Sequence, residues 1–185
     1  MIIFITIWSI WFLSEILLNR ILRSGDQDKK DQDKGTIRII CITIGFAISF
    51  GIIFTILFHL PISNYWIIPC LGLILIILGM ILRFISVWSL GRLFTVDVTI
   101  REHHKIKKDG IYRMIRHPSY SGSLLSFIGF GISLNNWISL IIIGTLVTIA
   151  MLHRIKIEER LLTDQFGSEY LEYTQSTYRL IPWIY

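Results

Sequence analysis

Charged residues are scarce in this chain, and their scarcity is the first indication of its class. They make up 17% of the 185 residues, against roughly 25% in soluble domains of ordinary composition, whereas hydrophobic residues make up 53%. Apolar runs of membrane-spanning length recur along the chain. The composition therefore excludes an ordinary soluble domain and predicts an all-α integral membrane protein, organised as a single membrane domain over residues 1–185.

Cysteine is also scarce, and other familiar signatures are absent. The two cysteines, Cys41 and Cys70, lie inside apolar runs without a C-x-x-C spacing, so the sequence predicts neither a disulfide framework nor a metal site. It contains no G-x-G-x-x-G motif, which argues against a Rossmann nucleotide domain. The net charge of +5 is explained by loops that face anionic lipid, so we expect no nucleic-acid partner.

Five apolar runs predict about five transmembrane helices. The runs cover residues 2–18, 37–60, 66–90, 119–134 and 137–152. The last two are short, because each spans about 24 Å as a helix against roughly 30 Å for a hydrocarbon core. Only Asn135 and Asn136 separate them, so we expect a tight helical hairpin with an Asn-Asn turn. One acid, Glu15, lies in the first run, where we expect it to be paired or to snorkel.

The distribution of basic residues predicts the topology. All 18 lysines and arginines fall with the loop after the first run, the loop after the third run (counted from Arg83 to Arg116) or the C-terminal segment. By the positive-inside rule these segments face the cytoplasm, the N-terminus lies outside and the C-terminus lies inside. The first run has no basic residues ahead of it and no small-residue cleavage motif after it, so we expect a retained span.

Two segments outside the runs have patterns typical of functional regions. Residues 91–117 mix β-forming and charged residues over a length that exceeds a simple interhelical turn, and long ordered loops often carry function. Residues 154–173 have the pattern of an amphipathic helix, which Gly167 weakens. We therefore look for polar side chains with a chemical role in these segments.

The stretch RHPSYSG places such side chains where the fourth run begins. Proline suits the first turn of a helix, so Pro118 predicts a helix start, with His117 at the cap and Tyr120 in the first turn. From spacing alone, a structural cap with an interfacial tyrosine is the favoured explanation of the pattern, and a polar binding notch is the alternative.

Further on, Arg154 and Glu158 are four residues apart and share a helix face. They form either a surface ion pair or an anion-binding arginine beside a cation-binding carboxylate. Glu159 points about 100° away around the helix and is the weaker candidate.

In this order, the motifs resemble the isoprenylcysteine carboxyl methyltransferase family. The resemblance is carried by HHKIKKDGIYRMIRHPSYSG, residues 103–122, and RIKIEERLLTDQFGSEYLEY, residues 154–173. Members are membrane enzymes that use S-adenosylmethionine without a Rossmann domain. The apolar runs predict three spans in residues 1–90, and the resemblance implies a methyltransferase core in residues 91–185. Its cytoplasmic cofactor pocket would be formed by the loop after span three, spans four and five, and a C-terminal amphipathic helix.

The resemblance also implies roles for individual residues. Arg154 matches the catalytic arginine that binds the substrate carboxylate, and Glu158 matches a cofactor-binding carboxylate. The other implied cofactor-binding residues are His104, Lys105, Ile106, Lys107, Tyr112, His117, Pro118, Ser119 and Tyr120. A further cofactor contact of the family would fall at Asp97, where this chain departs from the family's residue type. No metal ligand is implied.

The implied function is methylation of the C-terminal carboxylate of an isoprenylated cysteine, or of a similar lipophilic acceptor that enters from the bilayer. N-methylation of a phospholipid amine is the alternative, because the family also resembles phospholipid N-methyltransferases. An NADPH-dependent membrane reductase and a non-catalytic membrane subunit are more distant alternatives. The short loops suggest a prokaryotic-type member in the plasma membrane of a bacterium or archaeon. The sequence leaves the true acceptor and the oligomeric state open.

Overall fold

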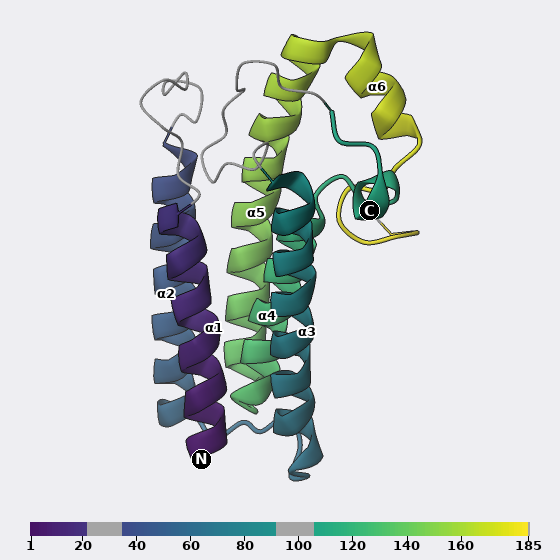
Figure 1. The fold of residues 1–185 in the computed structure, drawn as a ribbon. Coiled ribbons are helices and arrows are strands. Elements are labelled where there is room, and N and C mark those ends of the chain that lie inside the picture. Colours follow the sequence, from purple (N-terminus) through teal and green to yellow (C-terminus); the bar gives the residue numbers. More distant parts are fainter. Residues whose placement is uncertain (22–34, 92–105, 185) are drawn as a thin grey trace.

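The computed structural model describes residues 1–21, 35–91 and 106–184, and it is helical throughout these ranges apart from turns and one isolated β-bridge. Long helices lie side by side in an upright bundle, with the N-terminus at one end and α6 at the other (Figure 1). The elements are α1 (Ile2–Ile21), α2 (Thr36–Leu57), α3 (Ile67–Leu90), the short 3-10 helix η3 (Gly110–Arg113), α4 (Pro118–Ser133), α5 (Trp137–Phe166) and α6 (Ser168–Gln175). The predicted all-α architecture is confirmed.

The outer surface of the bundle is apolar. Among the described helices, α2, α3 and α5 are long and apolar enough to cross a membrane, whereas the apolar stretch of α1 is shorter. Large side chains such as Phe46, Phe50 and Ile53 of α2 are 44–57% exposed. A soluble monomer rarely exposes so much apolar surface, but lipid covers it at no cost. The protein is therefore an integral membrane protein, and the number of five spans stays a prediction.

The connection between α4 and α5 has the predicted Asn-Asn turn. Asn135 adopts a positive φ of 51°, and Asn136 caps α5 by accepting a hydrogen bond from the backbone N–H of Ser139. The side-chain amides also donate to the α2–α3 connection, Asn136 to the carbonyl of Phe58 and Asn135 to that of Ser63. The hairpin sets the start of α4 beside the second half of α5.

Helices α3 and α4 pack very closely because glycines face each other. A Cβ at Gly79 would lie 2.5 Å from the carbonyl oxygen of Gly122, and one at Gly122 would lie 2.6 Å from the backbone nitrogen of Arg83. Small residues allow such van der Waals contact between helices in lipid. Arg83 is thereby brought to α4, where it donates to Oγ of Ser119 at 3.1 Å, and its Nε lies 2.9 Å from Oε1 of Glu15. Glu15 is paired, as predicted, whereas Arg83 lies inside α3 and not in the loop after it.

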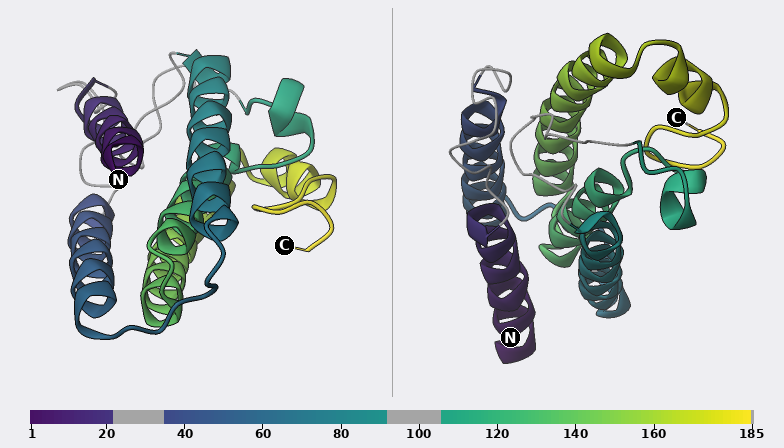
Figure 2. Two further views of the ribbon diagram at one scale, coloured as in Figure 1. Left: turned by 90° about the horizontal axis from the view of Figure 1, so that it is seen from below. Right: turned by 45° about the horizontal axis from the view of Figure 1, so that its top comes forward.

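Helix α5 continues well past the predicted end of the fifth span. Its 30 residues measure about 45 Å, which exceeds the roughly 30 Å of a hydrocarbon core. Gly167, with a φ of 53°, ends the helix, since glycine adopts this conformation without steric cost. The amphipathic helix expected over residues 154–173 is therefore two pieces, the end of α5 and the separate α6. Figure 2 shows α6 on the side of the bundle opposite α1 and α2.

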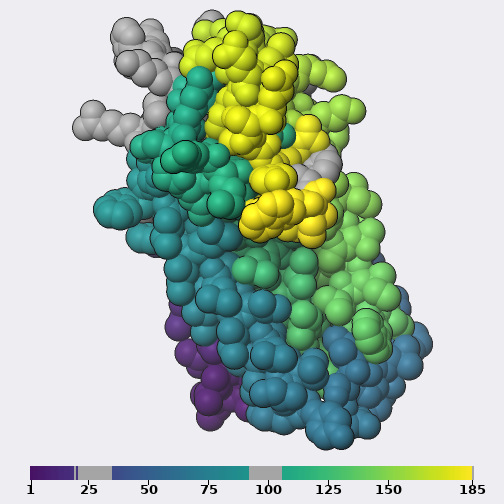
Figure 3. All heavy atoms as spheres, turned by 90° about the vertical axis from the view of Figure 1, so that its right-hand side faces the viewer, coloured from purple at the N-terminus to yellow at the C-terminus, as the bar shows by residue number. Residues whose placement is uncertain are grey.

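The C-terminal segment folds back onto the residues that precede α4. A parallel bridge joins Ile115 to Tyr178, and the backbone N–H of Arg116 donates to the carbonyl of Tyr178 at 2.8 Å. The hydroxyl of Ser121 donates to the carbonyl of Leu180 at 2.6 Å. Figure 3 shows this segment, in yellow, lying against the teal residues around η3. The segment therefore forms one wall of the region in which α4 begins.

Candidate active site

The site forms at the start of α4, at the same end of the bundle as α6. Pro118 occupies the first turn of α4 and His117 its N-cap, as predicted. A residue before proline is kept out of the helical conformation, and His117 adopts φ −122° and ψ 55°. Its backbone N–H donates to the carbonyl of Arg179 at 3.2 Å, and the residue is only 4% exposed. The backbone of His117 is therefore fixed between α4 and the C-terminal segment, and its side chain is buried.

Tyr120 connects the two α5 residues that the sequence singled out. Its hydroxyl donates to Oε2 of Glu158 at 2.8 Å and accepts from Nε of Arg154 at 2.8 Å. The four-residue spacing sets Arg154 and Glu158 on one face of α5, and the α4–α5 hairpin turns Tyr120 toward that face. Arg154 is 4% exposed. A buried cation and a carboxylate thus share one hydroxyl group.

The carboxylate of Glu158 remains partly open. Its side chain is 30% exposed, and Nδ1 of His117 lies 3.8 Å from its Oε1. Within residues 1–21, 35–91 and 106–184, no lysine or arginine forms an ion pair with it. Because its partners there are a hydroxyl and an imidazole, its negative charge is available to a cationic ligand.

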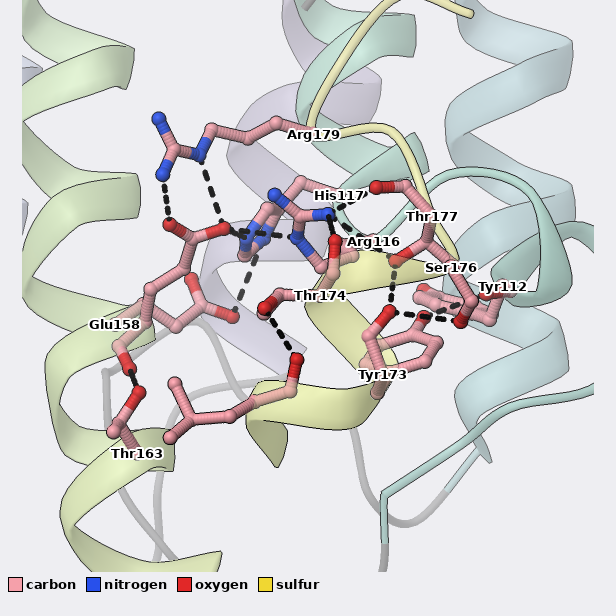
Figure 4. A network of polar contacts seen from close by, with 12 residues as sticks. Tyr112, Arg116, His117, Glu158, Thr163, Tyr173, Thr174, Ser176, Thr177 and Arg179 are labelled. Atoms are coloured by element: carbon pink, nitrogen blue, oxygen red, sulfur yellow. Dashed lines mark hydrogen bonds and ion pairs between the residues drawn. The ribbon is translucent and has the colours of Figure 1, made fainter. Parts of the chain in front are cut away.

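Glu159, the next residue, is instead a buried anion surrounded by cations. Its Oε1 accepts from Nε of Arg116 and from Nε of Arg179, both at 3.1 Å, and Nη2 of Arg179 lies 2.7 Å from its Oε2. Nε2 of His117 lies 3.3 Å from the same Oε1. Figure 4 shows Arg116, His117 and Arg179 converging on this part of α5. The cluster ties α5 to the residues before α4 and to the C-terminal segment.

Tyr112 and Ser119 lie nearby, but their side chains make hydrogen bonds within the protein. The hydroxyl of Tyr112 donates to the carbonyl of Ser86 at 3.2 Å, and the hydroxyl of Tyr173 donates to the carbonyl of Tyr112 at 2.6 Å. Burial raises the pKa of both phenols, that of Tyr173 to about 12, so both remain protonated donors at neutral pH. Ser119 accepts from Arg83. These contacts build the wall of the site.

The structure does not place the remaining predicted residues in the hydrogen-bond network of the site. Lys107 pairs with Asp109 at 3.0 Å, just before η3, and neither it nor Ile106 joins the hydrogen-bond network described above. His104, Lys105 and Asp97 lie outside the described residues. A surface hollow adjoins the network on the side of Tyr173, and it is lined by Lys108, Arg113, Glu172, Tyr173, Ser176 and Thr177.

Several contributors to the site were not predicted from the sequence. Arg116 belongs to the RHPSY motif, so the motif could have indicated that Arg116 contributes to the site. Glu159 was ranked below Glu158 because it points around the helix, and His117 and the two arginines lie in that direction. Thr36 of α2 accepts from Nη1 of Arg154 at 3.0 Å. No local pattern marks Thr36 or Arg179, because both reach the site only through the tertiary fold.

Chemically, the arrangement provides two charged positions side by side. Arg154 can bind an anion, and Glu158 together with His117 can bind a cation that carries N–H donors. The long apolar helices around them mean that a ligand with a lipid tail can approach through the bilayer. The fold is that of a multi-pass membrane protein, and a buried polar cluster lies at one end of its helices as a candidate binding site.

Comparisons with known proteins identify the family. A family model described as phospholipid methyltransferase matches residues 67–169, more than half of the chain. The chain is 40% identical over 131 residues to protein-S-isoprenylcysteine O-methyltransferase B of Arabidopsis thaliana, a match that covers 70% of this chain and 66% of the relative. It is 35% identical over 116 residues to the Saccharomyces cerevisiae protein-S-isoprenylcysteine O-methyltransferase, covering 62% and 48% of the two chains.

A solved structure agrees with these relatives. The eukaryotic intramembrane Ras methyltransferase ICMT superimposes with a TM-score of 0.66 at 29% identity, over 78% of this chain and 52% of that one. The present chain thus spans just under two thirds of the length of the Arabidopsis relative and about half of the solved structure. It belongs to the phospholipid methyltransferase family and, within it, to the isoprenylcysteine carboxyl methyltransferases, as the resemblance of its motifs predicted.

Proposed function

We propose that the protein is an S-adenosylmethionine-dependent methyltransferase that methylates the carboxylate of a lipophilic acceptor, such as the C-terminal carboxylate of an isoprenylated cysteine. The observation that carries the proposal is the shared hydroxyl of Tyr120, which joins a buried Arg154 to the partly open Glu158. The site therefore offers one position for an acceptor anion and an adjacent one for a cofactor cation. The relatives named above are isoprenylcysteine O-methyltransferases.

The residues present fit the charges of S-adenosylmethionine. The cofactor carries a sulfonium and an α-ammonium, and Glu158 presents a carboxylate that no described lysine or arginine neutralises. The imidazole of His117 lies between the two acids, with Nε2 3.3 Å from Oε1 of Glu159 and Nδ1 3.8 Å from Oε1 of Glu158, so its ring borders the proposed cofactor position. The rings of His117 and Tyr120, 5.7 Å apart, offer aromatic contact to a cation.

The other residues have supporting or family-derived roles in the proposal. Pro118 starts α4, and Tyr112 and Ser119 hold the wall against α3, so these residues shape the cofactor position without donating to the ligand. The proposed cofactor contacts of His104, Lys105, Ile106 and Lys107 rest on the family resemblance alone.

Methyl transfer to a carboxylate requires little acid–base catalysis from the protein. The bound cofactor supplies a methyl group activated by its positive sulfur. A carboxylate acceptor is already ionised at pH 7 and needs no general base. Arg154 binds and orients it, and the hydroxyl of Tyr120 fixes Nε so that the guanidinium has a defined direction. Arg154 is 4% exposed, so bulk water competes little for its guanidinium.

The membrane arrangement belongs to the same proposal. The site and the C-terminus face the cytoplasm, the N-terminus lies outside, and the lipid part of the acceptor enters between the spans from the bilayer. Residues 1–90 supply three of the five proposed spans, and residues 91–185 supply the methyltransferase core. The relatives named above are eukaryotic, so a bacterial or archaeal plasma membrane stays a prediction.

The test is methyl transfer from labelled S-adenosylmethionine to N-acetyl-S-farnesylcysteine in membranes that contain the wild type, Arg154→Ala or Arg160→Ala. Arg160 is an exposed arginine of the same helix and serves as the matched control. We expect base-labile label on the acceptor with the wild type and with Arg160→Ala, and none with Arg154→Ala. A wild type that does not bind S-adenosylmethionine would refute the proposal.

Phospholipid N-methylation is the second candidate, because the matching family model is described as phospholipid methyltransferase. In that case Arg154 would bind the lipid phosphate. The same labelled membranes separate the two reactions. Label that resists base and extracts with phospholipids would favour the second candidate, and base-labile label on the farnesylated acceptor favours the first.

A further inference from the structure

The hydrogen bond between Thr36 and Arg154 joins parts of the chain that lie 118 residues apart. Thr36 is the first residue of α2 and is 2% exposed, and its Oγ1 accepts from Nη1 of Arg154 at 3.0 Å. Both groups are buried, so the bond is protected from competing water. The N-terminal half of the chain therefore contacts the residue on which the proposed function depends.

Two hydroxyl groups of described residues bind the guanidinium of Arg154. Tyr120 of α4 binds Nε at 2.8 Å, and Thr36 of α2 binds Nη1 at 3.0 Å. The guanidinium is planar, with its donors in a fixed fork, so fixing two of its nitrogens sets the orientation of the whole group. Both of these partners are uncharged hydroxyl groups. An arginine that must meet a carboxylate in one orientation needs this kind of support.

We infer that Thr36 is a positioning residue, which orients Arg154 toward the carboxylate of the acceptor. The inference deepens the proposed function and rests on it. Thr36 acts through Arg154, which in the proposed function contacts the acceptor and not the cofactor. It predicts a selective effect: loss of the Thr36 hydroxyl weakens the use of the acceptor and leaves the use of S-adenosylmethionine unchanged.

A second threonine of α2 provides a matched control. Thr55, near the other end of the helix, also hydrogen-bonds across to α5, with its Oγ1 2.8 Å from Oγ of Ser139. That contact lies near the Asn-Asn turn, at the opposite end of α5 from Arg154, and serves only to hold the helices together. Replacing either threonine with valine keeps the side-chain shape and changes little in helix propensity. The two variants thus separate an effect on Arg154 from a general loosening of α2.

The experiment measures steady-state methyl transfer by the full chain, purified in detergent, with N-acetyl-S-farnesylcysteine as acceptor. For Thr36→Val we expect the KM for the acceptor to rise roughly threefold to tenfold, because one buried hydrogen bond is lost. The KM for S-adenosylmethionine should not change. Thr36→Ser restores the acceptor KM because it restores the hydroxyl. Thr55→Val leaves both KM values at the wild-type level.

Two results would overturn the inference. One is a wild-type acceptor KM in Thr36→Val, and the other is an equal rise in Thr55→Val. Thermal unfolding at increasing concentrations of the same acceptor measures its binding independently of catalysis. If the wild type transfers no methyl group but the acceptor stabilises it more than it stabilises Thr36→Val, the proposed reaction fails and the positioning role stands. If the acceptor neither reacts nor stabilises the wild type, both are wrong.

Discussion

Two neighbouring acids of α5, Glu158 and Glu159, face two different regions of the molecule. The Glu159 side is closed: the side chain is 11% exposed and bonded to Arg116, Arg179 and His117. The Glu158 side is partly open, with 30% of the side chain exposed and a hydroxyl and an imidazole as partners. The arginines that pair with Glu159 fix the architecture, whereas Glu158 has no lysine or arginine partner among the described residues and so offers its charge to a ligand. The type of partner therefore distinguishes a structural acid from a binding acid.

The largest expected effect comes from breaking the closed region. Glu159→Ala leaves Arg116 and Arg179 without their shared carboxylate in a buried setting, and we expect the free energy of unfolding to fall by about 3–5 kcal/mol. Unfolding of the purified protein in detergent measures this. Glu169→Ala is the control, because its pair with Lys108 is largely exposed and should contribute below about 1 kcal/mol. Similar losses for the two variants would contradict a structural role for the cluster.

The second largest effect is expected in the open region, on the affinity for the cofactor. Glu158→Gln removes the charge but keeps the shape, so we expect affinity for S-adenosylmethionine to fall roughly 10- to 100-fold, as for the loss of a charge-assisted hydrogen bond. Stability should stay near the wild-type value, since the side chain has no lysine or arginine partner among the residues described and glutamine can still accept from Tyr120. Isothermal titration together with thermal unfolding gives both quantities. Unchanged affinity would remove Glu158 from the cofactor site.

Local sequence patterns predicted the parts of this site that depend on local geometry. Pro118 marked the start of α4, and Asn135 and Asn136 marked the turn, because each has a strong conformational preference of its own. The four-residue spacing of Arg154 and Glu158 set them on one face of a helix whatever surrounds it. The hairpin then followed, and with it the approach of α4 to the end of α5.

The closed region could not be predicted in the same way. Helix geometry gives the direction of Glu159, but it does not say what lies there. Arg179 reaches it because the C-terminal segment pairs with residues 115–117, and Thr36 reaches Arg154 because α2 packs on α5. Such contacts depend on the packing of distant segments and leave no pattern in either segment alone.

A smaller effect tests the connection within the open region. Tyr120→Phe removes the hydroxyl that Arg154 and Glu158 share, so we expect kcat/KM for methyl transfer to fall roughly threefold to tenfold. Because Tyr120 and Thr36 hold the same guanidinium, the double variant with Thr36→Val should not show the sum of the two losses. Strictly additive effects in a double-mutant cycle would mean that the two hydroxyls act independently.

The smallest expected effect tests whether the closed region around Glu159 and the open region around Glu158 act independently. Arg179→Gln removes one of the two arginines on Glu159, but its side chain is 33% exposed and Arg116 keeps its own bond to Glu159 at 3.1 Å. We therefore expect a loss of stability of only about 1 kcal/mol, and no change in affinity for S-adenosylmethionine. The same titration and unfolding experiments measure both. Since His117 touches both acids, a loss of cofactor affinity as large as that of Glu158→Gln would show that the closed cluster controls the open site through this histidine.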